Sequence, residues 1–322
     1  MRYSRRDFGK LALAGLPAAA MWRAYGIAGL SAADKINSKI KGVRIGAITY
    51  SFRSMPADTI IPAYVKIGIG EMELMSNHAE ALAGMPSMPG GRGGGGRRGE
   101  PATPEQTAAR EAAQKAVREW RASASEATFK PVRKQIEDAG IALKALCYNM
   151  NVQRTTDADI EYGFMMAKWL GVQAITTSTQ VSMARRMAPF SDKHRIPVGF
   201  HGHADVNNPD EVSTPETFEA VMATSKYHWA NLDLGHFTEA GFDAVAFLQK
   251  HHGRITNLHL KDKKKGARGN GPWGTGDTPI KESLKLLQKN KWDIPANIEF
   301  EYEGDPVTEV AKCFQLCKEM LA

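Results

Sequence analysis

The sequence predicts a single α/β domain folded as a (β/α)8 TIM barrel, and three observations lead to it. The chain has 322 residues, enough for such a barrel, which needs about 250. Short β-branched, apolar runs alternate with helical patterns. Metal-ligand residue types end the last four of these runs. An open doubly wound sheet is the alternative, but it does not explain why those four runs end alike.

The predicted elements follow one another as βα units over residues 42–322. The expected strands are 44–49, 71–75, 142–148, 172–177, 197–201, 229–233, 255–260 and 296–301. The expected helices include 129–139, 160–170, 215–224, 244–252 and 280–290, where apolar residues recur at helical spacing.

Residues 1–33 read as a twin-arginine export signal. Ser4-Arg5-Arg6-Asp7-Phe8-Gly9-Lys10 precedes the apolar run 11–21, which is too short for a stable membrane span. A basic N-terminus followed by a surface helix is the competing interpretation. We expect cleavage near Ala32 or Ala33, a periplasmic or exported protein, and no stable membrane association after cleavage.

One segment interrupts the βα pattern. Residues 85–104, after the second expected strand, are rich in Gly, Pro and Arg and cannot bury apolar surface. They are expected to form a flexible insertion on the catalytic face. A lid over the substrate is the sharper alternative.

Charge and cysteine content exclude several classes of protein. The net charge is +7, but residues 1–32 contribute +4 and residues 86–104 contribute +2, which leaves the barrel nearly neutral. A nearly neutral surface does not neutralise phosphates, so we expect no nucleic-acid partner. Three cysteines make no disulfide framework and are expected to be buried as small apolar residues.

Four residues, His201, Asp233, His259 and Glu299, end successive expected strands. They lie 32, 26 and 40 residues apart, about one βα unit each time. Parallel strands of a barrel end at one mouth, where active sites lie. Imidazole and carboxylate together suit Mn²⁺, Co²⁺, Fe²⁺, Zn²⁺ or Mg²⁺. We therefore expect an enzyme with one divalent metal ion held by these four side chains.

Two neighbouring positions leave the ligand choice open. His203 lies two residues after His201, so both point to the same side of a strand. Glu299, Glu301 and Glu303 likewise share one face, where inward carboxylates would be costly without a cation. Glu299 is favoured as the ligand, with Glu301 as its substitute.

Two motifs resemble a known superfamily. Leu232-Asp233-Leu234-Gly235-His236 and Leu258-His259-Leu260-Lys261-Asp262 are similar to motifs of the xylose-isomerase-like TIM barrels, often called sugar phosphate isomerases/epimerases. The resemblance covers about residues 43–322 and implies metal ligands Glu, Asp, His and Glu at the ends of strands five to eight. Asp233, His259 and Glu299 match the last three, with Glu299 four residues after Pro295 as in that superfamily, and manganese is the favoured ion.

The first ligand position departs from the resemblance, because His201 stands where a glutamate is usual. Epimerases of the superfamily use two metal-bound carboxylates, one on each face of the substrate. A metal-bound imidazole is a poor base, so two-base epimerisation is in doubt, whereas one-base chemistry through Glu299 remains available.

Roles follow for the other residues near the expected mouth. We expect a catalytic set and a substrate-binding set that share the histidine three residues after Asp233, which the resemblance assigns to substrate. The catalytic set is Glu299, His201, His236 and Lys261, and the substrate-binding set is Glu73, His203, His236, Trp273 and Tyr50. The segment 269–277 lacks the Gly-Lys-Ser/Thr of a phosphate loop, but its Trp273 could stack on a sugar ring.

Four functions are compatible with such a site, and the expected partner is a small sugar or glycoside. The first is a 3-keto-glycoside lyase, which needs one base, tolerates His201 and suits an exported protein. The second is an aldose–ketose isomerase or ketose epimerase, which suits the fold but not the missing glutamate. An AP-endonuclease-like hydrolase and a non-catalytic sugar-binding protein follow. The sequence predicts no oligomeric state.

Overall fold

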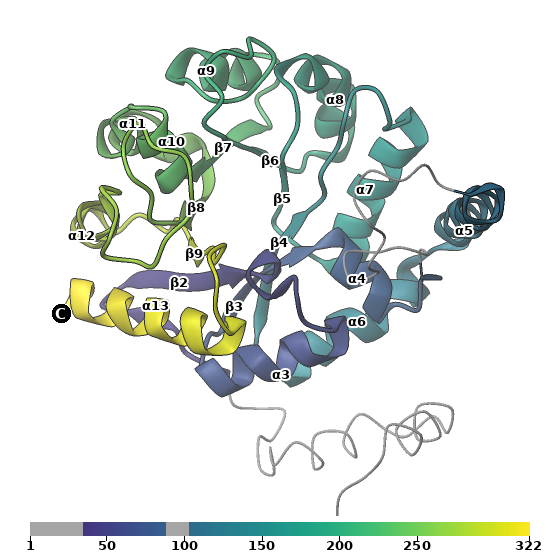
Figure 1. The fold of residues 1–322 in the computed structure, drawn as a ribbon, viewed down its shortest axis with the longest axis horizontal. Coiled ribbons are helices and arrows are strands. Elements are labelled where there is room, and N and C mark those ends of the chain that lie inside the picture. Colours follow the sequence, from purple (N-terminus) through teal and green to yellow (C-terminus); the bar gives the residue numbers. More distant parts are fainter. Residues whose placement is uncertain (1–34, 88–102) are drawn as a thin grey trace, which may run out of the picture.

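Eight parallel strands close into a barrel in the computed structural model, which describes residues 35–87 and 103–322 (Figure 1). Each strand pairs with the next, and the first also pairs with the last. The strands are β2 (Val43–Ile48), β3 (Glu71–Met75), β4 (Ala142–Cys147), β5 (Ala174–Thr177), β6 (Val198–His201), β7 (His228–Asp233), β8 (Ile255–Leu260) and β9 (Ala296–Ile298). A two-residue strand, β1 (Lys39–Ile40), pairs antiparallel with β2. The predicted fold is confirmed.

Helices form a ring around the strands (Figure 1). They are α3 (Ala57–Ile67), α4 (Ser76–Leu82), α5 (Pro104–Ser123), α6 (Glu126–Asp138), α7 (Asp157–Leu170), α8 (Val181–His194), α9 (Pro215–Ala223), α10 (Leu234–Glu239), α11 (Ala244–His251), α12 (Ile280–Asn290) and α13 (Pro306–Leu321), with short 3₁₀ turns η1 (Thr49–Phe52) and η2 (His252–Arg254). Apolar faces of the surrounding helices cover the outside of the barrel, so strands such as β2, β5 and β6 are buried throughout. Helix α5 is mostly exposed and lies outside this ring (Figure 1).

The last strand is shorter than predicted. β9 ends at Ile298, whereas the apolar pattern predicted a strand to residue 301. The backbone N–H of Glu299 still donates to Leu260 O, but beyond it Phe300 N donates to the side chain of Ser51. The chain therefore leaves the sheet at Glu299, with its carboxylate at the mouth.

Helix α5 corrects one boundary of the predicted insertion. Pro104 is its first residue, and Thr103 caps it through a reciprocal pair of hydrogen bonds with Gln106. Arg121, near its C-terminal end, forms an ion pair of 2.7 Å with the buried Glu80 of α4. The remainder of the predicted insertion, residues 88–102, lies outside the described residues, so its flexibility stays a prediction.

The expected leader, residues 1–33, also lies outside the described residues. In the part of the chain that the structure does describe, no helix has both the length and the apolar character needed to cross a bilayer. The three cysteines, Cys147, Cys313 and Cys317, are buried free thiols, as predicted.

Candidate active site

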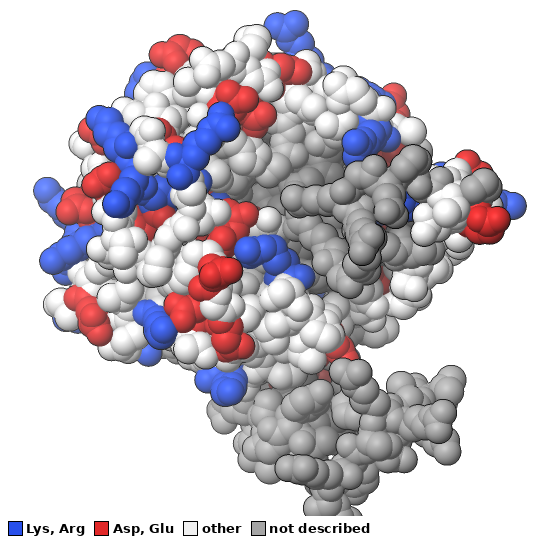
Figure 2. Space-filling model, in the orientation of Figure 1, with Lys and Arg blue, Asp and Glu red and all other residues white. Residues whose placement is uncertain are grey.

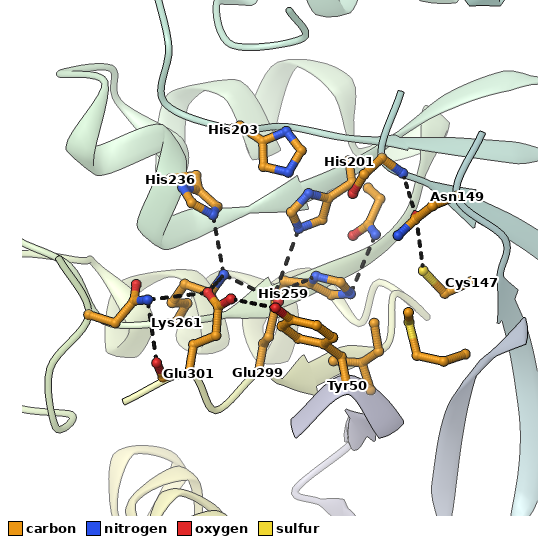
Figure 3. Close-up of a pocket in the computed structure, with 15 residues that line it drawn as sticks. Tyr50, Cys147, Asn149, His201, His203, His236, His259, Lys261, Glu299 and Glu301 are labelled. Carbon is orange, nitrogen blue, oxygen red and sulfur yellow. Dashed lines mark hydrogen bonds and ion pairs between the residues drawn. The ribbon is translucent and has the colours of Figure 1, made fainter. Parts of the chain in front are cut away.

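The four predicted metal ligands converge at the C-terminal mouth of the barrel, and Figure 3 shows three of them, His201, His259 and Glu299. His201, Asp233 and His259 occupy β6, β7 and β8, and Glu299 follows β9 directly. One ligand atom from each residue lies within 4.8 Å of all the others. The closest pair is His259 Nδ1 and Glu299 Oε2, at 2.8 Å, and His201 Nε2 lies 3.5 Å from Asp233 Oδ2.

These same atoms lack hydrogen-bond partners although they are buried. They are both ring nitrogens of His201, Asp233 Oδ2, His259 Nδ1 and Glu299 Oε2. Leaving a buried polar atom unpaired costs about 1–3 kcal/mol, and more for a charged group. Because the unpaired atoms face one another, a single cation between them would satisfy all four residues. The donor set therefore fits a divalent metal ion.

The charges at the site also favour a cation. The carboxylates of Asp233, Glu299 and Glu301 surround the ammonium group of Lys261, and a fourth carboxylate, that of Glu73, lies against His259. Burial lowers the pKa of His259, but Glu73 and Glu299 outweigh it and raise that pKa to about 10. The site thus attracts positive charge strongly, and a divalent ion would offset most of the uncompensated carboxylate charge.

Lys261 remains charged in the centre of the site. Its Nζ lies 3.2 Å from Asp233 Oδ2, 3.2 Å from Glu299 Oε1 and 2.9 Å from Glu301 Oε2. Burial lowers the pKa of Lys261, but Asp233, Glu299 and Glu301 outweigh burial and raise it. A lysine held as an ammonium is a hydrogen-bond donor and not a base, so it can stabilise negative charge on a substrate oxygen.

Glu301 stands outside the four-ligand cluster. Its Oε1 accepts a hydrogen bond of 2.9 Å from the hydroxyl of Tyr50, and its Oε2 accepts one from Lys261. With both carboxylate oxygens held by these partners, Glu301 orients Lys261, and Glu299 is the better candidate ligand.

Two histidines line the pocket above the cluster (Figure 3). His236 follows β7, where its backbone N–H donates to Asp233 Oδ1 at 2.8 Å. Burial lowers the pKa of His236 to about 4, so its ring is neutral. His203 is more exposed, and its Nδ1 lies 2.6 Å from Glu211 Oε1. Both rings are placed to contact a substrate.

The pocket encloses about 560 Å³ and has two unlike sides. Imidazole, carboxylate and ammonium groups come from β6 to β9 and the residues that follow them. The side formed by β2 to β5 and the residues that follow them is uncharged at neutral pH. Its residues are Ile48, Tyr50, Met75, Cys147, Asn149 and Ser178. Burial raises the pKa of the Cys147 thiol well above its ordinary value, so this thiol is not a base at neutral pH.

Two predicted substrate contacts are not supported by the structure. Glu73 is fully buried beneath the cluster, and its carboxylate already accepts hydrogen bonds from four side chains, including His259. It does not reach a substrate hydroxyl. Trp273 is 8% exposed and packs in the apolar core, so it does not line the pocket. Asn270, from the same glycine-rich segment, lines the pocket instead.

Sequence reasoning missed Asp262, which organises that glycine-rich segment. Its carboxylate accepts hydrogen bonds from the backbone N–H groups of Gly274, at 2.7 Å, and Gly276, at 3.0 Å. A Cβ added at Gly276 would lie 2.2 Å from Asp262 Oδ1, so this contact requires glycine. A side-chain hydrogen bond across a loop leaves no periodic pattern in the sequence.

A layer of buried amides beneath the cluster was also missed. Asn231, Asn257 and Asn297 each lie two residues before a candidate ligand and are at most 4% exposed. Since strand side chains alternate with a period of two, each amide points into the barrel on the same side as the ligand above it. That spacing was a usable signal.

The sequence matches no protein-family model, and it matches no curated protein. Solved structures do match its fold. A probable 3-DHS dehydratase from Bacillus anthracis gives a TM-score of 0.60 at 14% identity, over 85% of this chain and 98% of that one. D-allulose 3-epimerase from Methylomonas sp. gives a TM-score of 0.57 at 10% identity, over 86% of this chain and 98% of that one. The IOLI protein with a binding zinc atom gives a TM-score of 0.57 at 12% identity, over 87% of this chain and 96% of that one.

Other similar structures are named as sugar phosphate isomerases/epimerases from Parabacteroides distasonis and as a xylose isomerase domain protein from Alicyclobacillus acidocaldarius. At these identities the likeness concerns the fold. The chain has the (β/α)8 TIM-barrel fold of these structures.

Proposed function

We propose that this protein is an exported, divalent-metal-dependent enzyme that removes a proton next to the carbonyl of a keto-sugar. The specific activity proposed is that of a 3-keto-glycoside lyase, which eliminates the aglycone. The buried cluster of His201, Asp233, His259 and Glu299 supports metal dependence. Fold neighbours named as a dehydratase and a D-allulose 3-epimerase support chemistry on small polyhydroxylated substrates.

The uneven distribution of ionisable groups around the pocket supports a lyase over an epimerase. Glu299 stands on the charged side, whereas the facing residues Met75, Cys147, Asn149 and Ser178 offer no base at neutral pH. Epimerisation needs a second group on the opposite face of the substrate carbon to return a proton. Elimination needs one base only, and the described pocket residues provide that arrangement.

The elimination balances without an oxidant or water. Glu299 takes the C2 proton, which the neighbouring 3-keto group acidifies, and the C2–H electron pair becomes the C1–C2 double bond. The C1–oxygen bond breaks with its electron pair going to the aglycone oxygen, which takes up the proton from Glu299 and leaves as an alcohol. The sugar product is 2-hydroxy-3-keto-glucal when the substrate is a glucoside.

Residues of the chain have distinct roles in this scheme. Lys261 donates a hydrogen bond to the sugar oxygen on which negative charge develops, and Glu301 holds it in place at 2.9 Å. His236 and His203 bind sugar hydroxyls at the rim, and Tyr50 lines the wall next to Glu301. His201, Asp233, His259 and Glu299 would hold the metal ion. When bound, the ion would supply Lewis acidity that polarises the substrate carbonyl, and manganese is favoured.

An aldose–ketose isomerase or ketose epimerase is the second candidate, favoured by the names of several fold neighbours.

The AP endonuclease from Brucella melitensis shares the fold as well. However, the face seen in Figure 2 intersperses Lys and Arg with Asp and Glu, without the basic stripe that binds a phosphate backbone.

One assay separates the two candidates. Manganese-loaded protein lacking residues 1–33 is incubated with 4-nitrophenyl 3-keto-glucoside, and nitrophenol release is followed together with formation of 2-hydroxy-3-keto-glucal. We expect both products in equal amounts, with no release by the His259→Ala variant. Turnover of a free ketose without aglycone release would instead identify an isomerase or epimerase.

A further inference from the structure

The carboxylate of Glu73 lies at the centre of the barrel, directly beneath the candidate metal ligands. Its Oε1 accepts a 2.5 Å hydrogen bond from Thr176 Oγ1. Its Oε2 accepts hydrogen bonds from Asn297 Nδ2 at 2.8 Å and Asn257 Nδ2 at 3.0 Å, and lies 2.8 Å from His259 Nε2. The side chain is 0% exposed. A buried charge in such a position needs a reason beyond packing.

The amides around Glu73 determine which atoms carry protons. Asn257 also donates through Nδ2 to Asn231 Oδ1, and its Oδ1 accepts from the hydroxyl of Thr256, so its orientation is fixed. Glu73 Oε2 therefore faces two N–H donors and acts as an acceptor. Its 2.8 Å contact with His259 must then be donated by the imidazole, which places a ring proton on Nε2, and the amide nitrogen of Asn231 lies farther from this atom, at 3.4 Å.

The opposite nitrogen of the same ring faces the ligand cluster. With the proton on Nε2, Nδ1 of His259 carries the lone pair, and Nδ1 is the atom 2.8 Å from Glu299 Oε2. A metal ion bound between these two atoms would displace any second proton from Nδ1 and leave the ring with one proton, on Nε2. The hydrogen bond between Nε2 of His259 and Glu73 thus leaves Nδ1 of the same ring free to bind a metal ion.

We propose that Glu73 is a positioning residue for the metal site: it fixes the Nε2–H tautomer of His259, orients the ring and strengthens Nδ1 as a ligand. Carboxylates that accept from a metal-binding histidine typically account for 10–100-fold in metal affinity. The inference rests on metal binding by the cluster, as the proposed function does, but not on the identity of the reaction.

The test measures metal affinity and not turnover. Mn²⁺ is titrated into metal-free protein by calorimetry, with the Glu73→Gln variant, which keeps the shape and an acceptor oxygen but loses the charge. We expect the Kd for Mn²⁺ to rise about 10–100-fold. Glu71→Gln is the matched control, because Glu71 lies on the same strand but pairs with Arg44 at 2.7 Å, away from the site. Its Kd should equal that of the unchanged protein.

A second measurement requires no change at Glu73. In the zinc-loaded protein, ¹⁵N NMR of the histidine rings, with His259 assigned by its loss in His259→Gln, should show a protonated Nε2 and a metal-bound Nδ1. The reverse tautomer would overturn the inference, as would an unchanged Kd in Glu73→Gln. If the unchanged protein binds neither Mn²⁺ nor Zn²⁺, the metal site itself is refuted, and the proposed function fails with it.

Discussion

Nδ1 of His259 lies 2.8 Å from Oε2 of Glu299, and neither atom has a hydrogen-bond partner in the described structure. His259 comes from β8 and Glu299 follows β9, so the parallel pairing of these two neighbouring strands brings them together. Two candidate ligand atoms meet at the centre of a buried site. This relationship is the geometric basis for expecting a cation, and several predictions depend on it.

Removing a single candidate ligand should abolish metal binding. We expect Asp233→Ala and His259→Ala to lose both bound metal and activity, because each removes one of four ligand atoms that lie within 4.8 Å of one another. Metal content by elemental analysis and turnover of the keto-glucoside are the measurements. His252→Ala changes an exposed histidine outside the site and serves as control. Stoichiometric metal in both ligand variants would refute the site assignment.

Metal should stabilise the folded protein. The four ligand atoms lie within 4.8 Å of one another only in the folded protein, so the ion binds the folded chain selectively. At a free concentration of one hundred times Kd, Mn²⁺ should add about 2.7 kcal/mol to the free energy of unfolding. Urea unfolding with Mn²⁺ and with EDTA measures this difference. Identical midpoints under both conditions would contradict a native-state metal site.

Lys261 should contribute to catalysis without being needed for the metal. Replacing it by methionine removes an ammonium that lies 3.2 Å from both Asp233 Oδ2 and Glu299 Oε1. We expect kcat to fall by about 10²–10³, the usual loss for one donor to a developing oxyanion, while the Kd for Mn²⁺ does not rise. Lys264→Met, on the exposed loop, is the matched control. Loss of metal from Lys261→Met would instead assign this residue a structural role.

Acid should destabilise the protein through His228, which lies far below the site. Burial lowers its pKa to about 4, and its ring nitrogens bond Ser191 and Thr224. Its ordinary pKa is about 6.5, so the unfolded chain takes up a proton first as the pH falls. The contribution of His228 to the free energy of unfolding is fully present above about pH 6.5 and is lost progressively as the pH falls to about 4.

The Tm measured between pH 7 and pH 4 in the presence of EDTA should therefore decline less steeply in His228→Gln than in the unchanged protein. EDTA removes any contribution from metal. Equal slopes for the two proteins would show that His228 does not titrate in this range.

Helix α5 should depend on one buried ion pair. Arg121 donates two hydrogen bonds to Glu80, at 2.7 and 3.0 Å, and Glu80 is 1% exposed. Arg121→Met would leave a buried carboxylate without its cation, which typically costs about 3–5 kcal/mol. Arg110→Met, on an exposed turn of the same helix, should change the free energy of unfolding by less than about 0.5 kcal/mol. Urea unfolding of both variants decides whether the pair anchors the helix.

The sequence alone determined the barrel and the four candidate ligands. Local periodicity of apolar residues predicts strands and helices, and the predicted ranges 71–75 and 255–260 agree with β3 and β8. Ligand positions followed because parallel strands of a closed barrel end at one mouth. His201, Asp233, His259 and Glu299 could therefore be grouped without any knowledge of distances.

Only the tertiary structure decided what lies around those ligands. Glu73 and His259 are 186 residues apart, and whether a strand-end carboxylate faces the substrate or supports a ligand depends on which distant side chains fill the barrel beneath it. The same holds for Trp273, which is buried, and for Lys261, whose charge is maintained by carboxylates from β7 and the segment after β9. Periodicity is local, whereas protonation and hydrogen bonding are set by neighbours that only the closed fold assembles.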